Sequence, residues 1–172
     1  MVQQLLLVGR LESRPPRPTA DVLALAPRMQ RTWDALGILD RRLVLLDAAP
    51  DWLAVADGDQ LDQVLWALLD NAVKYGEGTV SVEIGAEPAA RTMWTTITDG
   101  GRGLEESDRA WLFGRFERGA AARTSGNGSG LGLYVSRALM RGMGGDLVLD
   151  QAGPGRGARF RLTLPGEPAG EG

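Results

Sequence analysis

The sequence predicts an α+β fold, a two-layer α/β sandwich in which helices pack against a sheet that contains antiparallel strands. The strongest periodic signal lies at residues 59–75, where apolar residues recur every three or four positions, as on one face of a helix. β-Branched residues are frequent at 79–86 and 91–99, and the turn around Pro88 between these runs favours an antiparallel pair. The elements also lack the regular alternation of a doubly wound parallel sheet. At 172 residues, the chain is long enough for one domain with a real core.

The remaining elements follow from apolar spacing, prolines and glycines. We expect a short helix within 2–12 that ends at a proline-rich linker, and a second helix at 20–36 that Pro27 could kink or delimit. Further along we expect strands at 42–46 and 52–56, a short helix at 107–113, a glycine-rich loop up to Gly130, a helix at 131–143, and closing strands at 146–151 and 158–164. The chain then divides into residues 1–18 as a helix end with its linker, 19–165 as the main domain, and 166–172 as a disordered tail.

Two absent residue types narrow the chemistry. The chain contains no cysteine and no histidine, which excludes disulfide frameworks, cysteine nucleophiles, thiolate or imidazole zinc sites, and Ser-His-Asp triads. The net charge of -3 argues against a nucleic-acid partner, and no apolar run approaches the roughly 18 residues of a membrane helix. We therefore expect a soluble chain with no membrane contact of its own and no secretory signal.

One flank of the central helix carries polar side chains. At about 100° per residue, Ala67, Asn71 and Lys74 share this flank, whereas Asp70 points nearly opposite the apolar stripe. The Asn71 carbonyl could bind magnesium, which takes only one or two protein oxygens and the rest from phosphates and water. Lys74, the only lysine among 19 basic residues, could bind a phosphate as a point charge. From this helix alone, an ordinary boundary amide and a solvated lysine are the simpler interpretation.

Two glycine-containing segments could approach a nucleotide. Asp99 ends a strand just before Gly101 and Gly103, so its carboxylate could accept an exocyclic amine while the glycines let the backbone approach a flat ring. A tight turn explains the same residues. The glycines at 126–132 lead directly into a helix, whose N–H groups and positive dipole end favour phosphate. Their spacing fits neither the dinucleotide-binding pattern nor the phosphate-loop pattern, and a flexible linker is the competing interpretation.

Phe113 and Phe116 lie between these segments, with arginines interleaved. The two aromatic rings could simply pack one face of a helical turn. Alternatively, they could anchor the base of a mobile loop whose arginines close over phosphates. The candidate arginines are Arg115, Arg118 and Arg123.

The order of these segments resembles the catalytic ATP-binding domain of two-component sensor histidine kinases. Residues 63–75 resemble the N box, 99–103 the G1 box, 113–116 the F box and 128–133 the G2 box. The resemblance covers residues 42–165 and implies the Bergerat fold, a mixed, mainly antiparallel sheet packed on three helices. It also implies the kinase activity, with ATP and Mg²⁺ as cofactors.

On the phosphate side, the resemblance implies that Asn71 binds Mg²⁺ and that Lys74 binds a phosphate of ATP. Residues 114–130, which include Arg118, would form the ATP lid. The end of the lid and the start of the next helix would hold phosphates, at Gly128, Gly130, Leu131, Gly132 and Leu133.

On the base side, the resemblance implies that Asp99 receives the adenine amino group, in a pocket shaped by Gly101 and Gly103. Tyr75 would lie near the nucleotide. Thr163, in the last strand, would lie near the base through water.

The sequence departs from the family pattern at two places. Ala67 stands where the family commonly has Asn, one turn before Asn71, so a second amide ligand for Mg²⁺ would be missing. The family's phosphoacceptor histidine is absent, although residues 1–13 resemble the end of the second helix of the dimerisation and phosphoacceptor hairpin. The implied partners are a His-bearing dimerisation domain, upstream or on another chain, and a response regulator. The implied location is the cytoplasm, or the cytoplasmic part of a membrane-bound sensor.

Two other functions stay open at this point. Relatives with the same fold, such as the gyrase, chaperone and mismatch-repair ATPases, hydrolyse ATP. They use a carboxylate in the Asn-bearing helix to activate water, and Ala67 offers no such base. The chain could also be a non-catalytic module that senses nucleotide or binds a partner.

Overall fold

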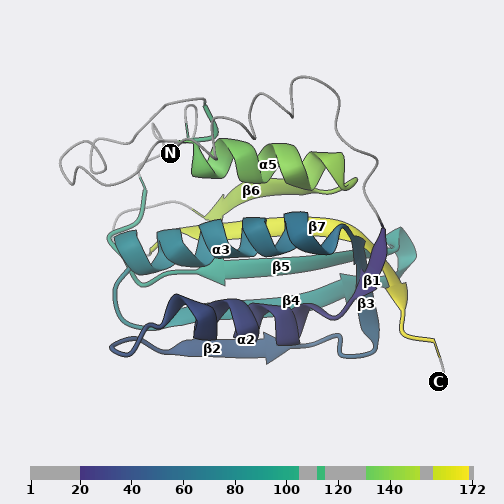
Figure 1. Cartoon of the computed structure of the whole chain (residues 1–172), viewed down its shortest axis with the longest axis horizontal. Helices are drawn as coiled ribbons and strands as arrows, with labels where there is room; N and C mark the ends of the chain where they lie inside the picture. Colours follow the sequence, from purple (N-terminus) through teal and green to yellow (C-terminus); the bar gives the residue numbers. More distant parts are fainter. Residues whose placement is uncertain (1–19, 105–111, 115–130, 152–156, 171–172) are drawn as a thin grey trace.

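The computed structural model describes residues 20–104, 112–114, 131–151 and 157–170. In this part of the chain, three α-helices cover one face of a seven-stranded sheet (Figure 1). The helices are α2 (Leu25–Leu36), α3 (Gly58–Tyr75) and α5 (Gly132–Gly142), and a 3₁₀ turn, η1, spans Pro88–Ala90. The predicted α+β sandwich is confirmed.

The sheet is mixed and mainly antiparallel. Its strands follow one another in the order β1-β3-β7-β5-β4-β2, and β6 pairs with β7 along the part of β7 that also pairs with β5. The pair of β2 and β4 is parallel, whereas the other described pairs are antiparallel. The strands are β1 (Asp21–Leu23), β2 (Leu43–Asp47), β3 (Trp52–Ala56), β4 (Val80–Glu87), β5 (Thr92–Thr98), β6 (Asp146–Gln151) and β7 (Arg159–Pro168).

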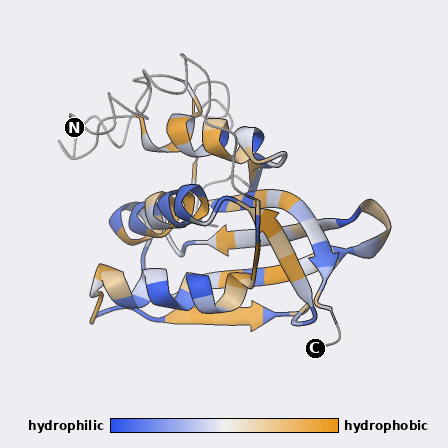
Figure 2. Cartoon of the chain, turned by 45° about the vertical axis from the view of Figure 1, so that its right-hand side comes forward, coloured by the Kyte–Doolittle hydropathy of each residue, from blue (hydrophilic) through white to orange (hydrophobic). Residues whose placement is uncertain are grey.

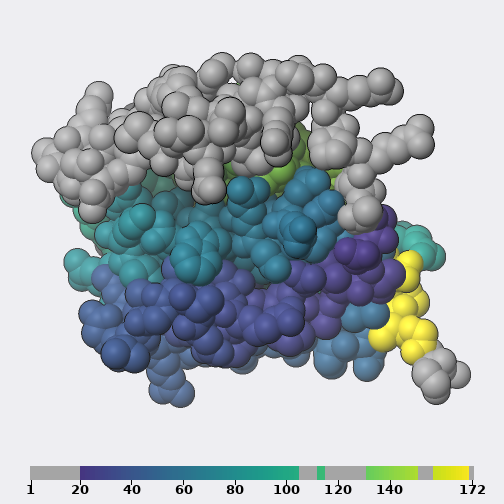
Figure 3. All heavy atoms as spheres, viewed as in Figure 1, coloured from purple at the N-terminus to yellow at the C-terminus, as the bar shows by residue number. Residues whose placement is uncertain are grey.

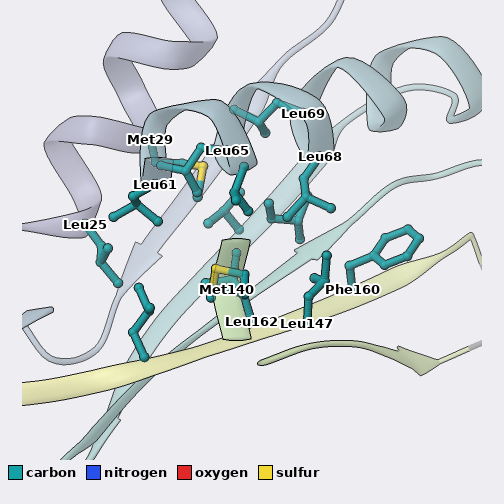
Figure 4. Packing of buried hydrophobic residues seen from close by; sticks show 14 of the residues in the cluster. Leu25, Met29, Leu61, Leu65, Leu68, Leu69, Met140, Leu147, Phe160 and Leu162 are labelled. Carbon is teal, nitrogen blue, oxygen red and sulfur yellow. The ribbon is translucent and has the colours of Figure 1, made fainter. Parts of the chain in front are cut away.

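Helix α3 lies at the centre of the helical layer and forms as its apolar pattern predicts. The Asp57 carboxylate caps its start by accepting a hydrogen bond from the Gln60 N–H at 3.0 Å. Figure 4 shows leucines of its apolar face pointing toward α5 and the sheet. Because the other side of α3 is polar, α3 is an amphipathic surface helix. Among the described residues, no helix has the length and apolar character needed to cross a bilayer. The buried residues of its stripe are Leu61, Val64, Leu65, Leu68, Leu69 and Ala72.

The core lies between the helices and the sheet. Alternate residues of the strands face it, as with Leu162 and Leu164 of β7, which are buried on either side of half-exposed Thr163. Met29 of α2 and Met140 of α5 close the core from the helical side. Figure 2 shows hydrophilic residues on the outer side of α2, and Figure 3 shows the side chains of α2 and α3 packed side by side. The core therefore holds both layers together.

The first described elements differ from the prediction. A helix was predicted over 20–36, but β1 occupies Asp21–Leu23 and α2 begins at Leu25. The reason is non-local, because β1 pairs antiparallel with β3, far along the chain. Pro27 does not kink α2, since it lies in the first turn, where N–H groups have no acceptor within the helix.

The last strand is longer than predicted. The sequence pattern ended it at residue 164 and predicted a disordered tail from 166, whereas β7 continues to Pro168. The extension pairs with β3, with Gly166 opposite Ala54, and the Gly166 N–H donates a hydrogen bond to the Arg91 carbonyl at 2.8 Å. The tail prediction is therefore wrong for residues 166–168, because β3 supplies backbone partners that local sequence does not reveal.

Other predicted elements agree with the structure or lie outside the described residues. The strands at 42–46, 52–56, 79–86 and 91–99 and the helix at 131–143 are confirmed within one or two residues. The helix predicted within 2–12 lies outside the described residues. So does most of the helix predicted at 107–113, of which the described residues 112–113 form a turn.

Candidate functional site

The topology brings the ends of several helices and strands to one end of the sheet. β5 ends at Thr98, which pairs with the first residue of β7 and with Ser81 near the start of β4. α3 ends at Tyr75, just before β4 begins, so its C-terminus lies at the same end. α5 begins there too, because a tight turn reverses the chain after α5 and β6 then runs back to Gln151, opposite the start of β7. Figure 1 shows this end at its left side.

Asp99 lies at the centre of this end, directly after β5. It is only 8% exposed. Its Oδ1 accepts hydrogen bonds from the Gly101 N–H at 2.9 Å and the Ala158 N–H at 3.0 Å, and its own N–H donates to the Ala158 carbonyl at 3.1 Å. Oδ2 accepts no hydrogen bond from the residues that the structure describes. The carboxylate is thus held by one oxygen, and the other could accept a hydrogen bond from a ligand.

Glycines allow the backbone to close tightly around Asp99. A Cβ on Gly76 would lie 2.6 Å from the Asp99 Cβ, and a Cβ on Gly157 would lie 1.8 Å from the Asp99 carbonyl oxygen. A Cβ on Gly101 would lie 2.5 Å from the Tyr75 carbonyl oxygen. These distances are too short for any side chain, so the end of α3, the segment after β5 and the start of β7 fit together only with glycine at these positions.

The structure confirms the tight turn at Gly101 and Gly103 and adds residues that the sequence did not indicate. Gly101 donates its N–H to Asp99 two residues earlier, and Gly103 has φ +80°, a conformation that favours glycine. The additional residues are Gly76, Gly157 and Ala158. The pairing of Asp99 with Ala158 depends on the register between β5 and β7, which sequence spacing could not supply.

The polar flank of α3 lies beside this end of the sheet. The Lys74 Nζ lies 2.5 Å from Oδ2 of Asp70, one turn earlier. An exposed pair of this kind is worth no more than about 0.5 kcal/mol, so a phosphate could readily displace Asp70. Asn71 is half-buried, and its amide makes no hydrogen bond to the described part of the chain. Tyr75 is 43% exposed at the end of the helix.

Asn71 suits the magnesium ion that the sequence implies. Its amide oxygen is a hard, neutral ligand at the edge of the apolar stripe, and no protein group competes for it among the described residues. The described residues contain no cluster of three or more acidic side chains that could hold a metal by themselves. A cation here would therefore depend on phosphate and water for most of its ligands.

The start of α5 faces the same end of the sheet. Its N-cap is Leu131, which is buried, and whose apolar side chain cannot accept hydrogen bonds from the N–H groups of the first turn. A Cβ on Gly132 would meet no atom of the described residues within 4 Å, so these residues leave the backbone there open to a ligand, whereas Leu133 packs against the core. Such a helix start favours phosphate. The predicted phosphate residues Gly128 and Gly130 lie outside the described residues.

Phe113 is attached to α5 by an arginine. The Arg137 guanidinium lies over the Phe113 ring, 4.7 Å from its centroid, and its Nε donates to Oδ1 of Asp146 at 3.0 Å. Arg141, one turn later, donates to the same carboxylate at 3.1 Å. Phe113 thus packs on α5, which is compatible with its predicted role as an anchor at the base of the loop at 114–130. Its predicted companion Phe116, and the arginines Arg115, Arg118 and Arg123, lie outside the described residues.

Thr163 does not lie with Asp99. It pairs with Trp94 on β5, and its Oγ1 accepts a hydrogen bond from the Asp146 N–H at 3.2 Å. It lies five residues, or about 16 Å of extended chain, from Ala158, the residue beside Asp99. Because β7 alternates its side chains, Thr163 also points away from the helical layer. The structure therefore brings together Asn71, Lys74, Tyr75, Asp99, Gly101, Gly103, Leu131, Gly132 and Leu133, but not Thr163.

Sequence comparison shows what this chain is similar to. Residues 56–168 match the family model described as "Histidine kinase-, DNA gyrase B-, and HSP90-like ATPase". The chain is 32% identical over 169 residues to the signal transduction histidine-protein kinase AfsQ2 of Streptomyces coelicolor, over 98% of this chain and 31% of that protein. The chain therefore spans about a third of the length of this curated relative.

Solved structures show the same architecture. The mycobacterial sensor histidine kinase MprB superposes with a TM-score of 0.75 at 28% identity, over 86% of this chain and 99% of that one. Full-length ShkA in complex with AMPPNP superposes with a TM-score of 0.83 at 22% identity, over 98% of this chain and 35% of that one. The ShkA likeness concerns the fold alone.

Proposed function

Because the chain belongs to the family of histidine kinase-, DNA gyrase B- and HSP90-like ATPases, we propose that it binds Mg-ATP around Asp99 and transfers the γ-phosphoryl group to a histidine outside this chain. The observation that carries this proposal is the Asp99 carboxylate. One of its oxygens is fixed by two backbone N–H groups, and the other is available beside a glycine-lined backbone. Such an oxygen is suited to accept the exocyclic amino group of adenine.

The phosphates would extend from this base site toward the start of α5. Lys74 would leave Asp70 to bind a phosphate, and the N–H groups around Leu131, Gly132 and Leu133 would bind others. Gly128, Gly130 and Arg118, in the segment before α5, complete the proposed phosphate set. Tyr75 would flank the nucleotide, whereas the position of Thr163 does not support a role at the base.

Asn71 would hold the Mg²⁺ through its amide oxygen, and the bound ion would neutralise charge on the phosphates. The protein's own contribution is to orient the triphosphate. In the transfer, a ring nitrogen of the acceptor histidine attacks the γ-phosphorus, the bond from that phosphorus to the bridging oxygen breaks, and ADP leaves with the electron pair. The 172 residues contain no histidine, so the acceptor must lie elsewhere.

The proposed partners follow from this need. A His-bearing dimerisation domain, upstream or on another chain, would supply the acceptor. An aspartate-bearing response regulator would then receive the phosphoryl group. We place these steps in the cytoplasm, where ATP is available. The similarity to sensor histidine kinases supports this scheme.

ATP hydrolysis is the second candidate, and the environment of Asn71 argues against it. One turn earlier, α3 carries Ala67 and therefore no carboxylate to activate water. Steady-state release of phosphate by the isolated chain distinguishes the two functions. We expect only slow release of phosphate. A rate typical of an ATPase would favour ATP hydrolysis over phosphoryl transfer to a histidine as the function of the chain.

A pair of α3 variants tests the proposed site. We expect Asn71→Ala to weaken Mg-dependent ATP binding by about tenfold, because it removes the proposed Mg²⁺ ligand. Gln63→Ala is the matched control, since Gln63 is an exposed amide on the same helix, away from Asp99. Calorimetric titration with and without Mg²⁺ provides the measurement. Equal affinities for the two variants would disprove the assignment of Asn71.

A further inference from the structure

Arg41 binds the end of α3 from a separate part of the chain. It lies in the connection between α2 and β2, and its Nη1 donates a hydrogen bond to the Gly76 carbonyl at 2.5 Å. The same nitrogen lies 3.4 Å from the Ala72 carbonyl oxygen, which already accepts the Gly76 N–H at 3.0 Å. A helix ends with carbonyls that lack partners and with the negative end of its dipole, so a cation is favourable here. Arg41 therefore fixes the backbone at Gly76.

Gly76 is also the residue against which the Asp99 side chain rests. A Cβ at Gly76 would lie 2.6 Å from the Asp99 Cβ and 3.2 Å from its Cγ, so the two residues are in direct contact. Gly101, whose N–H binds Asp99 Oδ1, in turn lies against Gly76 and the Tyr75 carbonyl. A shift of the end of α3 would move both surfaces that aim the carboxylate.

We infer that Arg41 is a positioning residue for recognition of the nucleotide base, acting through Gly76 on Asp99. This inference rests on the proposed role of Asp99. With Arg41 in place, the Asp99 carboxylate is held in one orientation. Its Oδ2 then selects a nucleotide base that carries a hydrogen-bond donor at the matching position. Without Arg41, the last turn of α3 loses its cap, and Oδ2 no longer points in a single direction. Selection for an amino group then falls more than general nucleotide binding, because Gly76 contacts Asp99 directly, whereas the proposed phosphate contacts at the start of α5 do not pass through Gly76.

The neighbouring Arg42 provides a matched control. It carries the same charge one position away, but its side chain is exposed and makes no hydrogen bond to the described residues. Its carbonyl accepts the Val80 N–H at 2.9 Å, and this backbone contact survives replacement of the side chain. An effect of charge on the triphosphate would appear in both arginine variants, whereas an effect through Gly76 would appear only in variants of Arg41.

The test is the affinity for ATP relative to ITP, which carries a carbonyl in place of the adenine amino group. Both are measured by competition with a fluorescent ATP analogue. We expect the wild type to prefer ATP by about a hundredfold or more. In Arg41→Ala this ratio should fall about tenfold, with ITP affinity nearly unchanged. Arg41→Lys, which keeps a donor but not the guanidinium fork, should be intermediate, and Arg42→Ala should keep the wild-type ratio.

The outcomes separate the inference from the proposed function. If the wild type does not prefer ATP, the role of Asp99 fails and the inference fails with it. If the wild type prefers ATP and Arg41→Ala weakens both nucleotides equally, Arg41 is only a structural or electrostatic residue, and the inference alone is overturned. Should Arg41→Ala fail to fold, the Arg41→Lys ratio decides, and a wild-type value for that variant overturns the inference.

Discussion

Asp99 has a structural role in its turn, and this role is compatible with the ligand-binding role proposed for the same side chain. The sequence left open whether residues 99–103 form a simple turn or a nucleotide contact, and the structure shows that the two are compatible. Oδ1 closes the turn by accepting the Gly101 N–H, and Oδ2 stays available in a nearly buried setting. Because a carboxylate has several acceptor positions, satisfying the turn does not use up its capacity for a ligand.

Thr95, by contrast, is a buried polar residue whose hydroxyl has no hydrogen-bond partner among the described residues. It is 0% exposed on β5, between Ile84 and Leu162, and its hydroxyl makes no hydrogen bond in the described part of the chain. An unsatisfied buried hydroxyl costs about 1–3 kcal/mol. We therefore expect Thr95→Val to raise the free energy of unfolding by about 1 kcal/mol, as measured by urea denaturation.

The adjacent Thr96 is the control for this prediction. It is also buried, but its hydroxyl accepts a hydrogen bond from Arg159 at 3.4 Å. Thr96→Val should therefore destabilise the protein by about 1 kcal/mol. Loss of stability in Thr95→Val similar to that in Thr96→Val would show that the Thr95 hydroxyl is satisfied after all.

At the scale of elements, α5 and β6 are joined by charge as well as by apolar packing. Asp146, the first residue of β6, accepts hydrogen bonds from Arg137 and Arg141 on consecutive turns of α5. Since Arg137 also lies over Phe113, the same cluster links α5 to the segment that follows the Asp99 turn. α5 thereby presents its N-terminus to the site while its C-terminal half is held to the sheet.

The Asp146 cluster predicts how stability depends on pH. Burial alone would raise the pKa of Asp146, but the hydrogen bonds from Arg137, Arg141 and the Leu147 N–H lower it from 3.8 to about 2. A carboxylate whose pKa is lower in the folded state stabilises the protein above its unfolded pKa, and this stabilisation is lost as the pH falls from about 4 to about 2. We expect Asp146→Asn to cost up to about 1 kcal/mol at pH 6, because the side chain is partly exposed and solvent screens the pair.

Urea unfolding of the wild type and Asp146→Asn at a series of pH values checks this prediction. The difference between the two should shrink below about pH 4, be mostly lost near pH 2 and vanish only below that pH. A difference that stays constant down to pH 2 would mean that ionisation of Asp146 does not contribute to it.

The β7 extension predicts a clear effect of truncation. Removing residues 166–172 deletes the pairing of β7 with β3 and the hydrogen bond from Gly166 to Arg91. We expect a loss of about 2 kcal/mol, from several backbone hydrogen bonds and the exposure of β3. Thermal unfolding provides the measurement, and removal of residues 171–172 alone should leave the midpoint unchanged. If both truncations behave alike, the extension adds nothing to stability.

At the scale of the whole molecule, the features that sequence could predict are those set by local pattern. The stripe of α3 and the strand pair around Pro88 repeat at short intervals, so their type and position were predicted nearly as the structure has them. Strand β1 depends on pairing with β3, far along the chain, and a three-residue strand carries almost no periodic signal.

The candidate site also combines features that local sequence pattern predicts with features that only tertiary structure determines. The places of Asn71, Lys74 and Asp99 in the fold could be predicted, because Asn71 and Lys74 lie on a helix with clear apolar periodicity and Asp99 directly follows a strand with a recognisable pattern. Thr163 was placed on the correct strand, but its side and its distance from Asp99 follow from the register of β7 with β5. Arg41 meets Gly76 only through tertiary folding, so no spacing within the sequence indicates it.

Asp99→Asn is the variant that tests whether the available oxygen of Asp99 receives the adenine amino group. The asparagine oxygen can still accept the N–H groups of Gly101 and Ala158, so the turn is preserved. The NH₂ group then replaces the acceptor with a donor, which cannot receive an amine. In calorimetric titration with Mg-ATP, we expect at least about 30-fold weaker binding than wild type, with an unchanged unfolding midpoint. Wild-type affinity in a folded Asp99→Asn protein would contradict this role of Asp99.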